Sequence, residues 1–122
     1  MKILAIEPIK KPRVMEIENT LKSMQKIVGG YIQVYDTFAD DNAVIVCNEE
    51  GKIYGLPPNR AIKDQKGNIQ DIIYGTFFIC QTNIRGEFEE LSEALIDVYT
   101  KKFTIPGDKN RLWTQILLDG FL

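Results

Sequence analysis

Apolar residues along the chain follow two different spacings, which predicts strands and helices in one domain. Residues 3–6 are apolar and residues 3–7 are predicted to form a short strand, and residues 14–18 alternate apolar and polar side chains after a turn rich in proline and lysine. Such a pattern is typical of a β-hairpin. The next segment has helical spacing between Asn19, a good N-cap, and Gly29-Gly30, which can end a helix. Its apolar face consists of Leu21, Met24, Ile27 and Val28.

The middle of the chain is rich in β-branched and aromatic residues, which favours strands. Residues 31–35 and 43–47 are expected to pair antiparallel across a polar loop, and residues 69–74 and 76–80 form two more strands separated by Gly75. Between them, residues 52–54 are predicted to return as a short strand after a turn in which Gly51 suits a left-handed conformation. Asn59 is predicted to cap a short helical turn at residues 60–62.

A second helix is predicted from Glu87 onward. Its acidic first turn and the basic pair Lys101-Lys102 in its last turn both suit the helix dipole, and the expected apolar face holds Phe88, Leu91, Leu95 and Val98. The fold class that follows is α+β: a mixed, mainly antiparallel sheet with two helices packed on one face. Residues 1–103 form a single domain, and residues 104–122 form a short C-terminal helical tail that docks on the domain or on a partner.

Composition narrows the range of functions. The chain has 122 residues, with 15 basic and 17 acidic side chains and a net charge of −2. It has no continuous basic stripe, so nucleic acid is not an expected partner, and no apolar run is long enough to span a membrane. We expect a cytoplasmic protein in which Cys47 and Cys80 are structural thiols.

The best candidate for a binding site is the stretch from Asn48 to Arg60. The diproline Pro57-Pro58 is stiff, so it would hold the Asn59 amide and the Arg60 guanidinium at fixed positions, where the guanidinium could recognise a carboxylate or a phosphate. The structural alternative, which we favour, is that Arg60 pairs with Glu49, Glu50 or Asp71 and that Asn59 caps a turn. The candidate site is therefore Pro57, Pro58, Asn59, Arg60, Glu49 and Asp71.

No catalytic residue is predicted. The chain has no histidine, its carboxylates lack the spacing of a calcium loop, and no nucleophile stands beside an obvious base, so we expect no metal site and no cofactor. Five aromatic residues could form a stacking platform for bases or for a partner, although alternation puts about half of them in the core, and we favour core packing. They are Tyr31, Tyr35, Tyr54, Phe77 and Phe78.

Four ordered segments, residues 26–32, 47–52, 55–60 and 71–79, resemble the bacterial domain-of-unknown-function family 3846. The resemblance runs from about residue 1 to residue 103. It implies a gene carried by phages, plasmids or conjugative elements, and it implies no activity and no catalytic residue.

Two functional hypotheses follow. The first is a small accessory protein of a mobile element or phage that acts without catalysis by binding a protein partner or a second copy. Its contact surfaces would be the diproline loop and the apolar tail, with Leu112, Trp113 and Ile116 as tail contacts. The alternative is a domain or enzyme that binds an anionic metabolite or a nucleotide in a pocket near Asn59 and Arg60.

Overall fold

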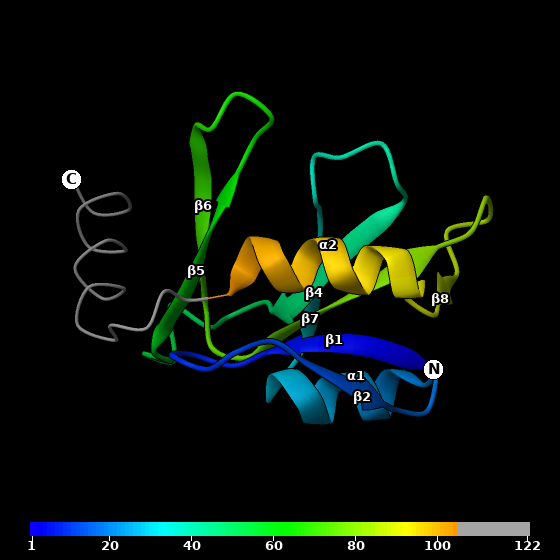
Figure 1. Ribbon diagram of the computed structural model, residues 1–122. Coiled ribbons are helices and arrows are strands. Elements are labelled where there is room, and N and C mark those ends of the chain that lie inside the picture. Colours follow the sequence, from blue (N-terminus) through cyan, green and yellow to red (C-terminus); the bar gives the residue numbers. More distant parts are fainter. Residues whose placement is uncertain (105–122) are drawn as a thin grey trace.

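An antiparallel sheet forms the centre of the computed structural model, which describes residues 1–104 (Figure 1). Its strands run in the order β2-β1-β7-β4-β3, and β8 pairs with β7 beside this path. The bounds are β1 Lys2–Ile6, β2 Arg13–Glu16, β3 Ile32–Asp36, β4 Ala43–Asn48, β7 Phe77–Thr82 and β8 Phe88–Glu89. Together with two helices, this sheet confirms the predicted α+β class.

A separate two-stranded antiparallel sheet is formed by β5 (Pro58–Lys63) and β6 (Ile69–Tyr74). Figure 1 shows this hairpin rising beside the C-terminal end of helix α2. Ile62 of β5 and Ile73 of β6 belong to the same buried cluster as Phe77 of the main sheet. The hairpin therefore completes a core that the main sheet and α2 begin.

The two helices, α1 (Leu21–Val28) and α2 (Glu93–Phe103), lie on opposite faces of the main sheet (Figure 1). Successive residues of β7 point to opposite faces, so Phe77 packs in the cluster of α2 and Phe78 in the cluster of α1. The prediction that both helices share one face is wrong in this respect. The central strands are apolar on both sides, so each face needs its own cover.

The ends of both helices differ from the predicted ones. Thr20, and not Asn19, caps α1, since its side chain accepts a hydrogen bond from Ser23 N, while Asn19 Nδ2 donates to Phe88 O. The helix ends at Gly29 with φ of 80°, as the sequence predicted. Helix α2 begins only after its cap Ser92, because residues 88–89 extend the sheet as β8.

Two local predictions between β4 and β6 are wrong. Residues 51–55, which include the predicted strand 52–54, form turns in which Tyr54 N donates to Glu50 O and Leu56 N donates to Gly51 O. Residues 60–62 belong to β5 and do not form a helical turn. The predicted tail, with Leu112, Trp113 and Ile116, lies outside the described residues. Neither helix described within residues 1–104 has the length and apolarity needed to cross a bilayer.

Candidate functional site

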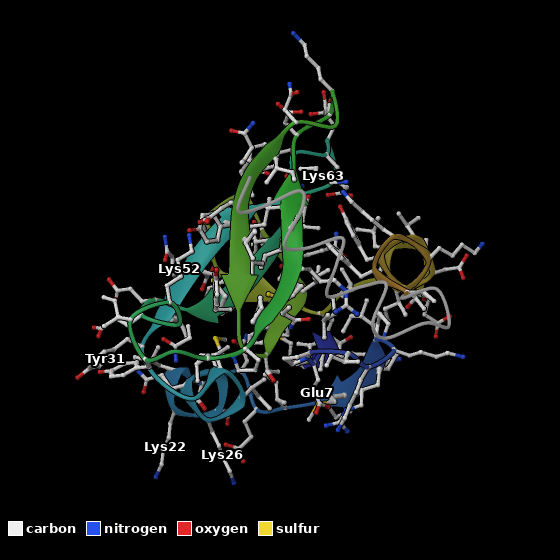
Figure 2. The ribbon with its side chains drawn as sticks, turned by 90° about the vertical axis from the view of Figure 1, so that its left-hand side faces the viewer. Glu7, Lys22, Lys26, Tyr31, Lys52 and Lys63 are labelled. Carbon is white, nitrogen blue, oxygen red and sulfur yellow. The ribbon has the colours of Figure 1, made fainter. Side chains whose placement is uncertain are left out.

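The turn of residues 49–55 separates two hollows on the surface. The smaller one, of about 220 Å³, contains Tyr35, Lys52 and Asp71 in its lining, and we call it the Asp71 hollow. The larger one, of about 510 Å³, contains Tyr31 and Tyr54, and we call it the Tyr31 hollow. Lys22 and Lys26 of α1 also line the Tyr31 hollow, and Figure 2 shows both projecting outward from that helix. The sequence stretch singled out as special thus borders both hollows.

Asn48 holds this turn against α1. Its Nδ2 donates to Val28 O at 3.2 Å, and its Oδ1 accepts from Glu50 N at 2.8 Å. The side chain therefore satisfies a carbonyl at the C-terminal end of the helix and shapes the start of the turn at the same time. Asn48 lines both hollows, so a single side chain fixes their relative position.

Gly51 is required by a close backbone approach. A Cβ at this position would lie 2.6 Å from Tyr74 O, which is closer than real contacts of this kind come. The residue does not adopt the left-handed conformation that the sequence suggested. Absence of a side chain thus lets the turn pack directly on β6.

The Asp71 carboxylate accepts three hydrogen bonds in the smaller hollow. Lys52 Nζ donates to Oδ1 at 2.5 Å, the Tyr35 hydroxyl donates to Oδ2 at 2.7 Å, and Ile72 N donates to Oδ1 at 2.7 Å. Burial alone would raise the pKa of Asp71, but these donors outweigh it and the net effect is a lowered pKa. The same carboxylate joins β3, the turn and β6, and thereby connects the two sheets.

Neighbouring groups of the Asp71 hollow are poor nucleophiles at neutral pH. Burial, followed by the hydrogen bond to Asp71, raises the pKa of Tyr35 to about 12. Burial, followed by the Asp71 charge, raises the pKa of Cys47 to about 12. Cys80 lies away from the hollow, in the cluster under α1, and burial raises its pKa to about 12 as well. Both thiols stay protonated, as a structural role requires. Within residues 1–104 no group of three His, Cys, Asp or Glu side chains gathers closely enough to hold a metal ion.

Arg60 is buried, with 5% of its surface exposed, and all five of its N–H groups have acceptors. Nε and Nη2 donate to Phe103 O at 3.1 and 3.0 Å, and Nη2 also donates to Lys10 O at 2.9 Å. Nη1 donates to Asn59 O at 3.1 Å and to Asn59 Oδ1 at 2.6 Å. Burial lowers the pKa of Arg60 to about 10. The guanidinium thus binds the last carbonyl of α2 and the turn after β1.

Asn59 is completely buried and complements Arg60. Its Nδ2 donates to Ile6 O and to Gly75 O, both at 2.8 Å, so it joins β5 to the ends of β1 and β6. No ion pair joins Arg60 to Glu49, Glu50 or Asp71 in the part of the chain that the structure describes, so that structural alternative is wrong in its choice of partner. Asn59 does not cap a helical turn either.

The six residues proposed from sequence fall into two groups. Glu49 and Asp71 line the Asp71 hollow together. Pro57 is exposed and Pro58 half-buried, whereas Asn59 and Arg60 lie in the interior behind them. The structure does not bring the guanidinium to the carboxylates. A binding role for these six residues stays a prediction.

The sequence pointed to Tyr31 and Tyr54 as part of a possible platform for a partner, but the favoured interpretation placed such aromatic residues in the core, and Ile53 was not singled out. Tyr31, Ile53 and Tyr54 are 68%, 80% and 68% exposed, and both tyrosines line the Tyr31 hollow. The signal was present, since a turn rarely needs two adjacent large apolar residues such as Ile53-Tyr54. Core packing, the favoured reading of the aromatic residues, holds for Phe77 and Phe78, which are fully buried.

Comparison with known proteins confirms the resemblance. A family model described as "Domain of unknown function (DUF3846)" matches residues 1–104, which are the residues that the structure describes. No curated protein and no solved structure matches the chain. The match assigns no activity, so the function has to be argued from the surfaces above.

Proposed function

We propose that this chain, which belongs to the domain-of-unknown-function family DUF3846, acts by binding another protein. The contact surface consists of Tyr31, Ile53, Tyr54 and Pro57, which we call the binding corner. This surface includes the exposed start of the diproline loop. In keeping with the family resemblance, the proposed setting is an accessory gene of a mobile element or phage and a cytoplasmic protein.

The observation that carries the proposal is the exposure of large apolar side chains around a hollow. Tyr31, Ile53 and Tyr54 leave more than two-thirds of their surface to solvent. Both tyrosines line the cavity of about 510 Å³, and Ile53 lines the neighbouring one of about 220 Å³. Contiguous exposed apolar surface is typical of protein contact sites, and tyrosine is enriched at their centres. Lys22 and Lys26 at the rim favour a partner that places an apolar side chain in the hollow and carboxylates beside it.

The reactive side chains of the described residues support binding over chemistry. The Asp71 carboxylate already accepts three hydrogen bonds, the Cys47 thiol is buried and protonated, and every N–H group of Arg60 has an acceptor inside the fold. A catalytic group needs a free lone pair or a proton to transfer at the surface. The binding corner exposes apolar and aromatic groups, which can make contacts with a partner.

A capture experiment with matched variants tests the proposal. The tagged wild-type chain, Tyr31→Ala/Tyr54→Ala and Ile84→Ala/Val98→Ala are incubated with lysate of the native host, and retained proteins are quantified by mass spectrometry. Ile84 and Val98 are exposed and lie outside the corner, so their truncation removes similar surface elsewhere. We expect at least one protein retained by the wild type and by the control, and reduced about tenfold or more by the tyrosine variant. Equal retention by all three chains would contradict the proposal.

The alternative is a domain that binds an anionic metabolite or nucleotide near Asn59 and Arg60. The geometry supports it less, because both side chains are buried and the guanidinium has no spare donor. A thermal-shift screen with inorganic phosphate and nucleotides measures it directly, since a ligand stabilises only the state that binds it. Stabilisation of the wild type that Arg60→Lys abolishes would favour this alternative over protein binding.

A further inference from the structure

Within residues 1–104, the backbone groups on the outer edge of β3 have no partner. Glu49 N donates to Tyr31 O at 2.8 Å, so the residue pair 31/49 is hydrogen-bonded, and alternation makes 33/47 and 35/45 the other bonded pairs. The pairing of β4 with β7 is consistent with this assignment. Thr82 N donates to Asn42 O, so the backbone groups of the even-numbered residues of β4 point toward β7 and those of the odd-numbered residues toward β3. The N–H and C=O groups of Ile32, Val34 and Asp36 therefore face away from β4. Among the described strands, β3 has no second neighbour.

Within the described residues, this edge carries fewer of the features that protect a sheet than the other edge does. The other edge strand, β2, follows Pro12 and carries Arg13 and Glu16, which discourage pairing with another chain. Strand β3 has five residues with no proline and no lysine, and its central Val34 is 45% exposed. An edge of this kind is suited to accept a further strand through main-chain hydrogen bonds.

We infer that the strand added at this edge is β3 of a second copy of the chain. An antiparallel pairing centred on Val34 gives every residue of Ile32–Asp36 a partner within the same strand of the other copy. Val34 then meets Val34 on the two-fold axis, Gln33 lies opposite Tyr35, and Ile32 lies opposite Asp36. No like charges oppose each other directly, and the two main sheets become one continuous sheet.

The charges at the two ends of β3 favour a second copy in this orientation. The hollow beside the start of β3 is lined by Lys22, Lys26 and Glu50, which leaves a net positive charge. The hollow beside the end of β3 is lined by Asp36, Asp40, Asp64 and Lys66, which leaves a net negative charge. Asp36 and Ile32 point to the same face of the sheet, the face that α1 covers with Lys22 and Lys26. Antiparallel pairing therefore brings Asp36 of each copy to the end where the other copy has Lys22 and Lys26, twice per dimer.

This inference rests on the proposed function, because it names one protein that is bound at the edge next to the binding corner. Its first test is sedimentation velocity of the full chain from about 1 μM to about 100 μM, a range in which a specific homodimer is detectable. We expect concentration-dependent dimers of the wild type and of Val34→Thr, which keeps the N–H group. Val34→Pro removes one outward N–H and no bond to β4, so it is expected to stay folded by circular dichroism and to weaken the dimer at least about tenfold.

A charge exchange provides a second, independent test that does not depend on the proline variant. Lys22→Glu/Lys26→Glu and Asp36→Lys/Asp40→Lys are each expected to weaken the homodimer, because like charges then face each other. An equimolar mixture of the two variants is expected to form mixed dimers, because each interface regains opposite charges. If Val34→Pro and both charge variants dimerise as tightly as the wild type, self-association uses another surface and the inference is overturned.

The outcomes separate this inference from the proposed function. A chain that is monomeric at about 100 μM but still retains a host protein through Tyr31 and Tyr54 overturns the inference alone. A dimer that responds as expected at Val34, with no host protein retained through the tyrosines, supports the inference and overturns the binding corner.

Discussion

At the scale of single residues, Arg60 shows how a buried cation can be held without a carboxylate. Its guanidinium binds backbone carbonyls of Phe103, Lys10 and Asn59 and the side-chain oxygen of Asn59. The carbonyl of Phe103 is one of those that the end of a helix leaves without a partner. Arg60 therefore acts as a C-terminal cap for α2 from a strand of the second sheet.

We predict that Arg60→Ala lowers the free energy of unfolding by about 3 kcal/mol, because it leaves buried carbonyls without donors. Arg60→Lys should recover only part of this loss, since an ammonium group cannot reproduce the planar fork. Urea denaturation followed by circular dichroism measures both. Arg85→Ala, at an exposed position, is the control and should change stability by less than about 0.5 kcal/mol. An Arg60→Ala chain as stable as this control would refute the capping role.

The sequence indicated that Asn59 and Arg60 are special, but it could not predict what they bind. Their partners lie far away along the chain, at a separation of 43 residues for Phe103, 50 for Lys10 and 53 for the bond from Asn59 to Ile6. Polar residues after a rigid diproline look the same in sequence whether they face solvent or the core. Whether these residues face solvent or the core depends on how β5 packs against β1 and α2.

At the scale of elements, the two helices illustrate which sequence patterns are sufficient to predict the fold and which are not. Residues 43–47 and 77–80 are continuously apolar, and such runs are typical of strands covered on both faces. This pattern could have predicted one helix on each face. The start of α2 was harder, since Phe88 and Leu91 fit helical spacing but belong to opposite buried clusters. Their separation depends on β8 pairing with β7.

The connection between the two sheets leads to a prediction about pH. Because the donors around Asp71 hold its folded-state pKa below the unfolded value of about 3.9, its stabilising contribution is complete above that value and disappears as the pH falls through the folded-state pKa. Asp71→Asn should therefore cost about 2 kcal/mol at pH 7 and progressively less below about pH 4. Urea midpoints between about pH 7 and pH 2.5 measure the difference.

A matched control distinguishes this buried carboxylate from an ordinary surface ion pair. Asp97 forms an exposed pair with Lys101 on α2, with Oδ2 3.1 Å from Nζ. Such pairs contribute little, so Asp97→Asn should change stability by less than about 0.5 kcal/mol at either pH. If Asp71→Asn behaved like Asp97→Asn, the Asp71 carboxylate would not connect the two sheets energetically.

At the scale of the whole molecule, the two buried clusters indicate which residues the domain needs in order to fold. One lies between the main sheet, α2 and the β5–β6 hairpin, and the other lies under α1. Residues from Ile3 to Phe103 contribute to them, and the family match covers the same span. The domain boundary predicted near residue 103 is thus compatible with the packing, and a truncation can test it.

We predict that a fragment of residues 1–104 unfolds cooperatively, with a free energy of unfolding within about 1 kcal/mol of that of the full chain. This fragment retains Phe103, whose carbonyl accepts from Arg60, and Tyr99, whose hydroxyl donates to Asp41 Oδ2 at 2.6 Å. A fragment of residues 1–92 lacks both aromatic side chains, which exposes one buried cluster, so it should lose cooperative unfolding. Calorimetry of the three chains decides the matter. A fragment of residues 1–104 without a cooperative transition would mean that residues 105–122 are part of the folding unit.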